Sequence, residues 1–126
     1  MPHYERESVS ITTGSSSAAG SGTTSPANGH LVAIIYVEDG TAPLETATIV
    51  ITGNTTGIVL WSKTGVDANV NVYPLAAAVL ASTGAAITNS GVPVPLANEA
   101  IAIAVSVAGN SKTGVFTFII EGSFMS

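Results

Sequence analysis

The chain has 126 residues, contains no cysteine and carries a formal net charge of −5 with only three basic residues. This length fits one domain that can bury a core, and the lack of cysteine excludes a disulfide framework, thiol catalysis and thiolate zinc sites. Three cations are too few for a nucleic-acid interface, which needs several Lys or Arg side chains on phosphates. The charged start MPHYERES and the lack of an apolar run of about 18 residues predict a soluble, cytoplasmically made protein without a secretory signal or membrane span.

The low charge content is the most unusual property of the composition. Charged residues are 9% of the chain, against about 25% in an average soluble domain. The range 68–98 has no ionisable side chain except Tyr73. A surface this poor in charge is typical of a protein that covers part of itself in an oligomer or a larger assembly. The alternative is a thermostable or secreted β-sandwich with a threonine-rich exterior.

Hydrophobic residues recur with a period of two, which predicts strands rather than helices. Val9 and Ile11 alternate in a first strand at 8–13. The range 14–29 (GSSSAAGSGTTSPANG) has linker composition, but too few residues precede it for a domain, so it is expected to be a long loop or a weak edge strand. The expected strands are 8–13, 31–38, 46–52, 58–62, 69–73, 99–107 and 115–121.

The alternation also predicts which side chains face the core. The strand 69–73 is expected to place Val70 and Val72 inward and to pair with the strand that contains Trp61. In the two most regular strands, the residues expected on one face are Ala47, Ile49 and Ile51, and Ile101, Ile103, Val105 and Val107.

The segment 74–97 is expected to form an extended excursion. Its alanines favour a helical turn, whereas its glycines and prolines break any longer helix, so at most one short helix is expected near 74–82. Seven or eight short antiparallel strands predict an all-β sandwich or jelly roll. The expected organisation is a single domain, with an N-terminal arm and first strand at 1–13, a Gly/Ser-rich loop at 14–29 and the sandwich core at 30–126.

The tetrapeptide SKTG occurs twice, at 62–65 and at 111–114. A phosphate-binding loop needs glycine before the lysine and a helix after it, and a penicillin-recognising site needs an S-x-x-K motif. Ser62 and Ser111 precede the lysines, and the chain has no S-x-x-K. Gly109, Asn110 and Gly114 are instead residue types that tolerate the positive φ of tight hairpins. Both copies are therefore interpreted as turns.

No other pattern points to catalysis or to a bound ion. His3 and His30 have no carboxylate at ligand spacing, and two histidines alone do not make a metal site. Asp39 has no dense acidic loop around it of the kind that binds calcium. Trp61 and Tyr73 could line a sugar platform, but two aromatic residues near a turn are more typical of a core. The sequence predicts no enzyme, no catalytic residue, no cofactor and no metal.

Four blocks of the sequence are patterns of strands and turns in a fixed order. They are NGHLVAIIYVEDG, ITGNTTGIVLW, NVNVYP and ANEAIAIAVSVAGNSKTGVFTFII, and they span about 28–120. In order and spacing these blocks resemble a family of small virion proteins of tailed bacteriophages, the head decoration or cement proteins. The chain departs from that family where Leu75, Ala100 and Ala102 stand in place of basic residues. No catalytic residue is carried over.

The resemblance implies a structural virion protein, made in the host bacterial cytoplasm, that binds the assembled head on the capsid surface and stabilises it. Its expected partners are the major capsid protein and itself, as a homotrimer or homodimer, with no nucleic acid and no membrane. The expected docking elements are the charge-free excursion and the N-terminal arm 2–8. The residues expected to make these contacts are Tyr4, Arg6, Leu75, Val79 and Leu80.

Two other functions remain open at this point. One is a host-recognition module of a head or tail fibre that binds cell-surface carbohydrate, which would need aromatic residues with Asn and Asp clustered on loops. The other is a bacterial surface or secreted adhesive domain, which the missing signal segment weakens.

Overall fold

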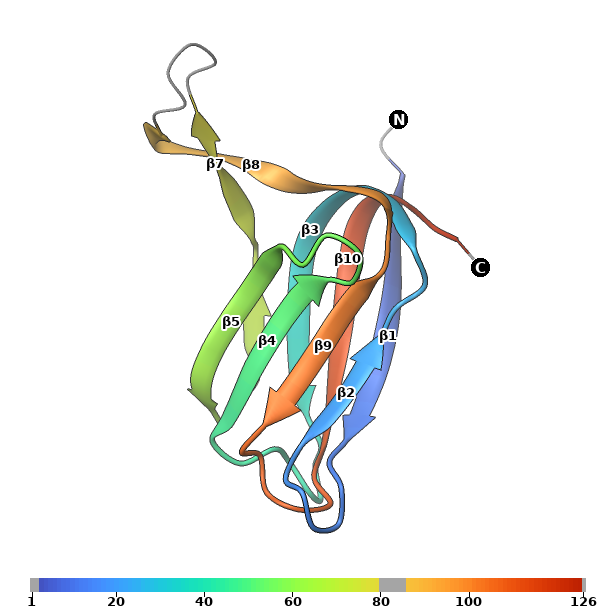
Figure 1. Cartoon of the computed structure of the whole chain (residues 1–126), viewed down its shortest axis with the longest axis vertical. Coiled ribbons are helices and arrows are strands. Elements are labelled where there is room, and N and C mark those ends of the chain that lie inside the picture. The colour runs from blue at the N-terminus through green and yellow to red at the C-terminus, as the bar shows by residue number, and fades with distance from the viewer. Residues whose placement is uncertain (1–2, 80–85, 126) are drawn as a thin grey trace.

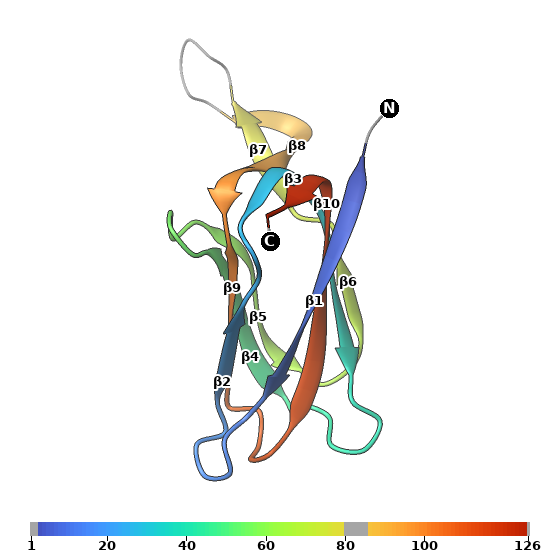
Figure 2. The same ribbon diagram turned by 90° about the vertical axis from the view of Figure 1, so that its right-hand side faces the viewer.

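The protein is an all-β sandwich of two antiparallel sheets packed face to face (Figures 1 and 2). The computed structural model describes residues 3–79 and 86–125, and these form ten strands and no helix. The sandwich class predicted from the period-two pattern is confirmed. The strands are β1 (Tyr4–Thr12), β2 (Gly20–Thr23), β3 (Ala27–Glu38), β4 (Ala47–Gly53), β5 (Val59–Val66), β6 (Val70–Val72), β7 (Leu75–Val79), β8 (Ala86–Glu99), β9 (Ile101–Ser106) and β10 (Thr113–Phe124).

The two sheets differ in size and in what they position. The six-stranded sheet has the order β1-β10-β3-β8-β7, and β6 also pairs with β3. The four-stranded sheet has the order β2-β9-β4-β5. Strand β3 is long enough to pair with β6 through residues 34–36 and with β8 through residues 27–31. The edge strands of the first sheet are therefore β1 on one side and β7 and β6 on the other.

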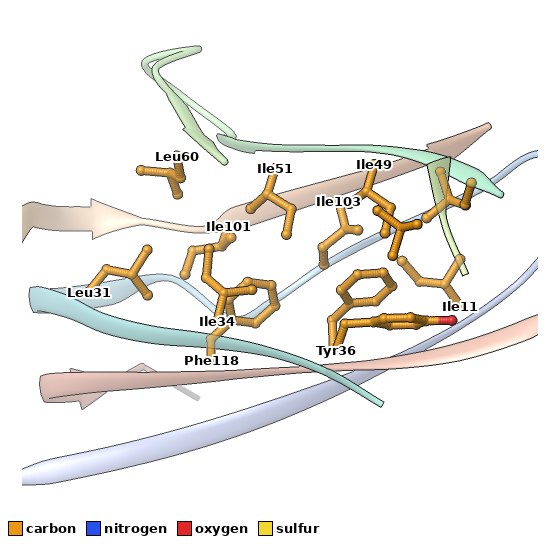
Figure 3. Close-up of a cluster of buried hydrophobic side chains, with 14 of the residues drawn as sticks. Ile11, Leu31, Ile34, Tyr36, Ile49, Ile51, Leu60, Ile101, Ile103 and Phe118 are labelled. Atoms are coloured by element: carbon orange, nitrogen blue, oxygen red, sulfur yellow. The ribbon is translucent and has the colours of Figure 1, made fainter. Parts of the chain in front are cut away.

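The core lies between the sheets and is built from alternate residues of each strand, as Figure 3 shows. Ile49, Ile51, Ile101 and Ile103 of one sheet face Phe118 and its neighbours on the other, and each is at most 1% exposed. Burial of each such side chain contributes about 1.5–3 kcal/mol. The inward faces predicted for 46–52 and for Ile101, Ile103 and Val105 are confirmed.

Two predictions about the strands are wrong. Strand β6 does turn Val70 and Val72 toward the core, but it pairs with β3 and not with the strand that contains Trp61. Strand β5 instead pairs with β4, the strand before it in the chain, and forms one edge of the four-stranded sheet. Val107 is 69% exposed, because β9 ends at Ser106 and Val107 has a left-handed φ of 56°.

Two segments form more strand than expected. The range 14–29 contains β2, a short edge strand that pairs with β9, and the start of β3, whereas 14–19 and 24–26 are turns and loop, so both the edge-strand and the loop interpretations hold in part. Residues 75–79, where a short helix was allowed, form strand β7, because pairing with β8 overrides the helical preference of alanine. The excursion therefore adds β7 and β8 to the expected seven or eight strands.

The two SKTG copies differ in structure. The first lies inside β5 and is not a turn, although Gly65 has a φ of 69°. The second begins in the β9–β10 turn, where Gly109 and Ser111 have positive φ, and continues into β10. Gly114 does not have positive φ, and its lack of a side chain serves a different purpose: a Cβ there would lie 2.5 Å from Cε1 of Tyr36.

Candidate docking surface

The most distinctive element of the structure is the hairpin formed by β7 and β8, called here the β7–β8 hairpin. It extends away from the body of the sandwich at the end where the β4–β5 turn lies (Figures 1 and 2). Leu75 pairs with Pro93, Ala76 with Val92 and Ala77 with Gly91. Among the described residues, β7 and the first part of β8 pair only with each other. A two-stranded ribbon alone is marginally stable in water, so this part of the chain gains from further contacts.

The base of the hairpin is firmly joined to the sandwich. The last part of β8 pairs with β3, where Leu31 lies opposite Val94 and Ala27 opposite Glu99. Leu96 is 6% exposed and belongs to the core. The backbone N–H of Asn98 donates to the Asn28 side-chain oxygen at 2.7 Å. The hairpin is therefore a projection held by a rigid base.

Glu99 ties this base to the β4–β5 turn. Its side chain is 5% exposed and accepts hydrogen bonds from the Thr55 N–H (2.9 Å), the Thr56 N–H (3.0 Å) and the Thr56 hydroxyl (2.7 Å). The hydrogen bond from the Thr56 hydroxyl is the main cause that holds the pKa of Glu99 below its usual value. Gly53 leaves room for this carboxylate, since a Cβ there would collide with it. Glu99 has a structural role and no acid–base partner within the turn.

An apolar cavity of about 180 Å³ opens between the turn and the hairpin base. Ile58, Leu60, Val94 and Leu96 supply most of its apolar wall, and Glu99 lies at its polar side. Ile58 and the neighbouring Val59 are 57% and 60% exposed. The cavity is large enough for one or two apolar side chains, and the exposed pair lies beside it. This face can therefore receive a partner through apolar contact.

Strand β1 forms a second candidate surface, at the edge of the six-stranded sheet opposite to β7. Alternate residues of β1 turn Tyr4 and Arg6 outward, and Tyr4 is 56% exposed. A cavity of about 320 Å³ is lined by Glu5, Arg6, Glu7 and residues near the chain's other end. The Glu7 carboxylate accepts a hydrogen bond from the Ser25 N–H at 2.7 Å, so this carboxylate links β1 to the segment before β3.

Glu5 is similarly engaged. Its carboxylate lies 2.9 Å from Nε2 of His3 and accepts from the Phe124 N–H at 2.8 Å. The hydrogen bond with His3 is the main cause that lowers the pKa of Glu5, and the Phe124 N–H adds to it. Glu5 thus joins the first strand to the last, and Glu7 joins the first strand to the segment before β3. The two carboxylates are not arranged as an acid and a base around a shared substrate position.

The structure places the five predicted contact residues in two separate regions. Tyr4 and Arg6 lie on β1, and Leu75 and Val79 lie on β7, at the opposite end of the six-stranded sheet. Leu80 lies outside the described residues. The N-terminal arm is not a free extension, because residues from Tyr4 onward pair with β10. The two predicted docking elements are therefore not brought together into one site.

The outer face of the six-stranded sheet connects these two regions and was not predicted. On β10 and β3, the outward residues Val115, Ile119 and Ile35 are half-buried, and Val37 is 44% exposed. Along β1, serines and threonines take the same face, and the Ser8 hydroxyl lies 2.8 Å from that of Thr117. The sequence did contain a signal for this face, because apolar residues occupy the outward as well as the inward positions of β3 and β10.

The structural role of Glu99 at the hairpin base was also not predicted. The signal available in the sequence was its position as the first charged residue after the charge-free range 68–98. A lone carboxylate is a candidate acceptor for backbone N–H groups, but the turn at 53–57 that supplies them lies far from Glu99 in the sequence. Within 3–79 and 86–125, no cluster of His, Asp and Glu has the geometry of a metal site. The same described residues contain no helix with the length and apolarity needed to span a membrane.

Comparison with known proteins gives little further information. No protein-family model matches the chain, and no curated protein matches it. One similar solved structure is described as "Crystal Structure of FLHE", with 11% sequence identity and a TM-score of 0.43, and the alignment covers 94% of this chain and 96% of that one. At this level of similarity the match supports no conclusion about function.

Proposed function

We propose that the protein is a structural virion protein that binds the assembled head of a tailed bacteriophage as a decoration or cement protein. The observation that carries the proposal is the β7–β8 hairpin, an uncharged ribbon that extends from the sandwich and in which, among the described residues, β7 pairs only with β8. The resemblance of the four strand-and-turn blocks to head decoration proteins supplies the kind of partner. The major capsid protein is then the surface on which the hairpin docks.

The distribution of charge supports docking through this end of the molecule. All three basic and all eight acidic residues lie outside 68–98. Glu5, Arg6, Glu7 and Glu121 lie at the β1–β10 edge, away from the hairpin. A neutral hairpin can be buried against another protein without the cost of removing charges from water. The apolar cavity at its base adds a place where a capsid side chain can insert.

The protein is proposed to act as a homodimer or homotrimer on the head. Local two-fold and three-fold positions recur over a capsid, and an oligomer can contact several capsid subunits at once. When one chain has bound, the next binds at a high effective concentration, so weak individual contacts give high occupancy. No catalytic step is part of this function.

The carbohydrate-binding alternative finds little support in the described residues. Tyr36, Phe116 and Phe118 are at most 1% exposed, and Trp61 packs against the core. The exposed aromatic residues Tyr4 and Tyr73 lie on separate segments of the chain, with exposures of 56% and 68%. These residues do not form an aromatic platform, which is the usual basis for sugar stacking.

The proposal is tested with purified protein and phage heads that lack it. The test variant removes 77–91 and joins Ala76 to Val92 through Asn-Gly, the preferred two-residue hairpin turn. This change preserves the Leu75–Pro93 pair and the pairing of β8 with β3. The full chain is expected to co-sediment with heads, whereas the shortened variant remains folded and stays in the supernatant.

Two matched variants test whether β1 contributes to docking beyond a general charge effect. Arg6→Glu and Lys63→Glu make the same change in charge at exposed positions on different sheets. If β1 contributes to docking, Arg6→Glu lowers occupancy on heads and Lys63→Glu does not. If the full chain does not bind heads, or if the shortened variant binds as well as the full chain, docking through the hairpin is wrong. Binding of the full chain to host cells but not to heads would favour the adhesin function.

A further inference from the structure

Five edge strands of the sandwich, β1, β6 and β7 in one sheet and β2 and β5 in the other, are protected to different degrees, and β6 has only three residues. Edge strands present free N–H and C=O groups, and monomeric proteins protect them with charge, short length or irregularity. Strand β1 carries Glu5, Arg6 and Glu7, and β2 has only four residues. Strand β5 carries Lys63, and its ladder with β4 is interrupted by two register shifts.

Strand β7 is only one residue longer than β2 and its ladder is irregular, but it has no protection from charge. Its sequence, Leu-Ala-Ala-Ala-Val, contains no charged residue and no proline. It is the terminal strand of the six-stranded sheet, so one side of its backbone has no strand partner among the described residues. The irregularity in its ladder with β8 places the extra residues on β8, because Ala77 and Val79 pair with Gly91 and Ala86. Strand β7 is therefore an open template for another strand.

We propose that β7 pairs in antiparallel fashion with β7 of a second copy, around a two-fold axis at Ala77. The five-residue sequence is self-complementary in size. Antiparallel pairing about Ala77 places Leu75 opposite Val79 of the second copy, and Ala76 opposite Ala78. Each residue then has the same environment in both chains, as a two-fold interface requires. The pairing joins two six-stranded sheets into one continuous sheet.

Charge favours a second copy as the occupant of this edge. Each chain carries a net charge of −5, so two copies repel each other where their charged regions approach. The range 68–98 contains none of the charged residues, and β7 lies within it. Pairing through β7 thus joins the molecules where their mutual repulsion is weakest. This inference rests on the self-association that forms part of the proposed function, and it defines the strand and symmetry of that association.

The absence of cysteine allows a direct test by cross-linking. In an antiparallel pair, opposite Cα atoms lie about 4.5–5.5 Å apart, within the range of about 4.4–6.8 Å that a disulfide spans. In the Ala77→Cys variant the only disulfide that can form joins position 77 of two chains. Ser62→Cys, at the exposed β5 edge, is the matched control. Under mild oxidation of dilute protein, Ala77→Cys is expected to convert to a linked dimer, with Ser62→Cys remaining monomeric.

A second measurement uses the unmodified chain and no oxidant. Sedimentation of the natural sequence is expected to give twice the chain mass of 12.5 kDa. Ala77→Lys, which adds the charge that other edges carry, is expected to return the mass to that of one chain, with circular dichroism confirming that it is folded. A monomeric natural chain, a folded Ala77→Lys variant that stays dimeric, or equal cross-linking at 62 and 77 would each overturn the inference.

These measurements are made without phage heads, so they separate the inference from the proposed function. A dimer linked at position 77 that does not bind heads would support the inference and contradict the decoration function. A monomer that binds heads would contradict the β7 pairing and support the decoration function.

Discussion

The replacement of Glu99 by alanine is expected to destabilise the protein, because this residue makes several hydrogen bonds although it has no ionic partner among the described residues. The carboxylate is 5% exposed and accepts three hydrogen bonds, two of them from the backbone N–H groups of Thr55 and Thr56. Alanine leaves these donors without their acceptor in a site that is only partly buried, since Thr55 and Thr56 are themselves exposed. Each unsatisfied buried donor costs about 1–3 kcal/mol. Because the exposed side of the turn admits water to part of the site, we expect a total loss of about 2–4 kcal/mol in the free energy of unfolding.

The same carboxylate predicts a dependence of stability on pH. The pKa of Glu99 in the folded protein lies below the value of 4.5 for an unperturbed glutamate, mainly because of the Thr56 hydroxyl. The folded state therefore favours the ionised form. Its contribution to stability is fully present above about pH 4.5 and is lost as the pH falls from there through the folded pKa. Glu99→Gln removes this contribution at neutral pH and flattens the corresponding acid transition.

Urea unfolding measures both effects. The midpoints for the natural chain, Glu99→Ala, Glu99→Gln and the exposed control Glu38→Gln are compared at neutral pH and again below pH 4. We expect the natural chain and the Glu38→Gln control to lose more stability on acidification than Glu99→Gln. If Glu99→Ala unfolds within about 0.5 kcal/mol of the natural chain, the range of an ordinary surface substitution, the three hydrogen bonds do not hold the turn and the reasoning is refuted.

Three further substitutions test other parts of the sandwich by the same unfolding measurement. Tyr36→Phe is expected to raise the free energy of unfolding by about 1 kcal/mol, because the buried Tyr36 hydroxyl makes no hydrogen bond of good geometry among the described residues; a clear loss of stability would show that its contact with the Leu44 backbone is a hydrogen bond. Gly114→Val is expected to cost about 1–3 kcal/mol through overpacking, since its Cβ would lie 2.5 Å from the Tyr36 ring and 3.0 Å from Leu44, and a neutral effect would contradict this. Lys112→Ala is expected to change stability by less than about 1 kcal/mol, because the Glu45 side of its 2.8 Å ion pair is open to solvent; loss of a magnesium-dependent ATP affinity in this variant would restore the phosphate-binding interpretation.

The proposed docking surface follows only in part from the sequence. The lack of charge in 68–98 identified the segment that becomes the β7–β8 hairpin, because charge content is a property of composition and needs no fold. Its projection from the sandwich depends on where β8 begins to pair with β3, which is at Val94, so the part of β8 before Val94 lies outside the sandwich. The sequence also suggested a free N-terminal arm, whereas Tyr4 and Arg6 belong to a paired edge strand.

The sequence by itself determined the strand-forming segments and most of their inward faces. Alternation in Ile49 and Ile51, and in Ile101 and Ile103, is a local pattern, and burial on one face follows wherever the strand is placed. The partner of each strand is a different matter, because many strands of similar apolar character compete for the same edges. Thus β6 pairs with β3 and not with the Trp61 strand, and Leu-Ala-Ala-Ala-Val becomes a strand against its helical preference. Only the tertiary structure decides such pairings, since the hydrogen bonds that fix them join residues far apart in the chain.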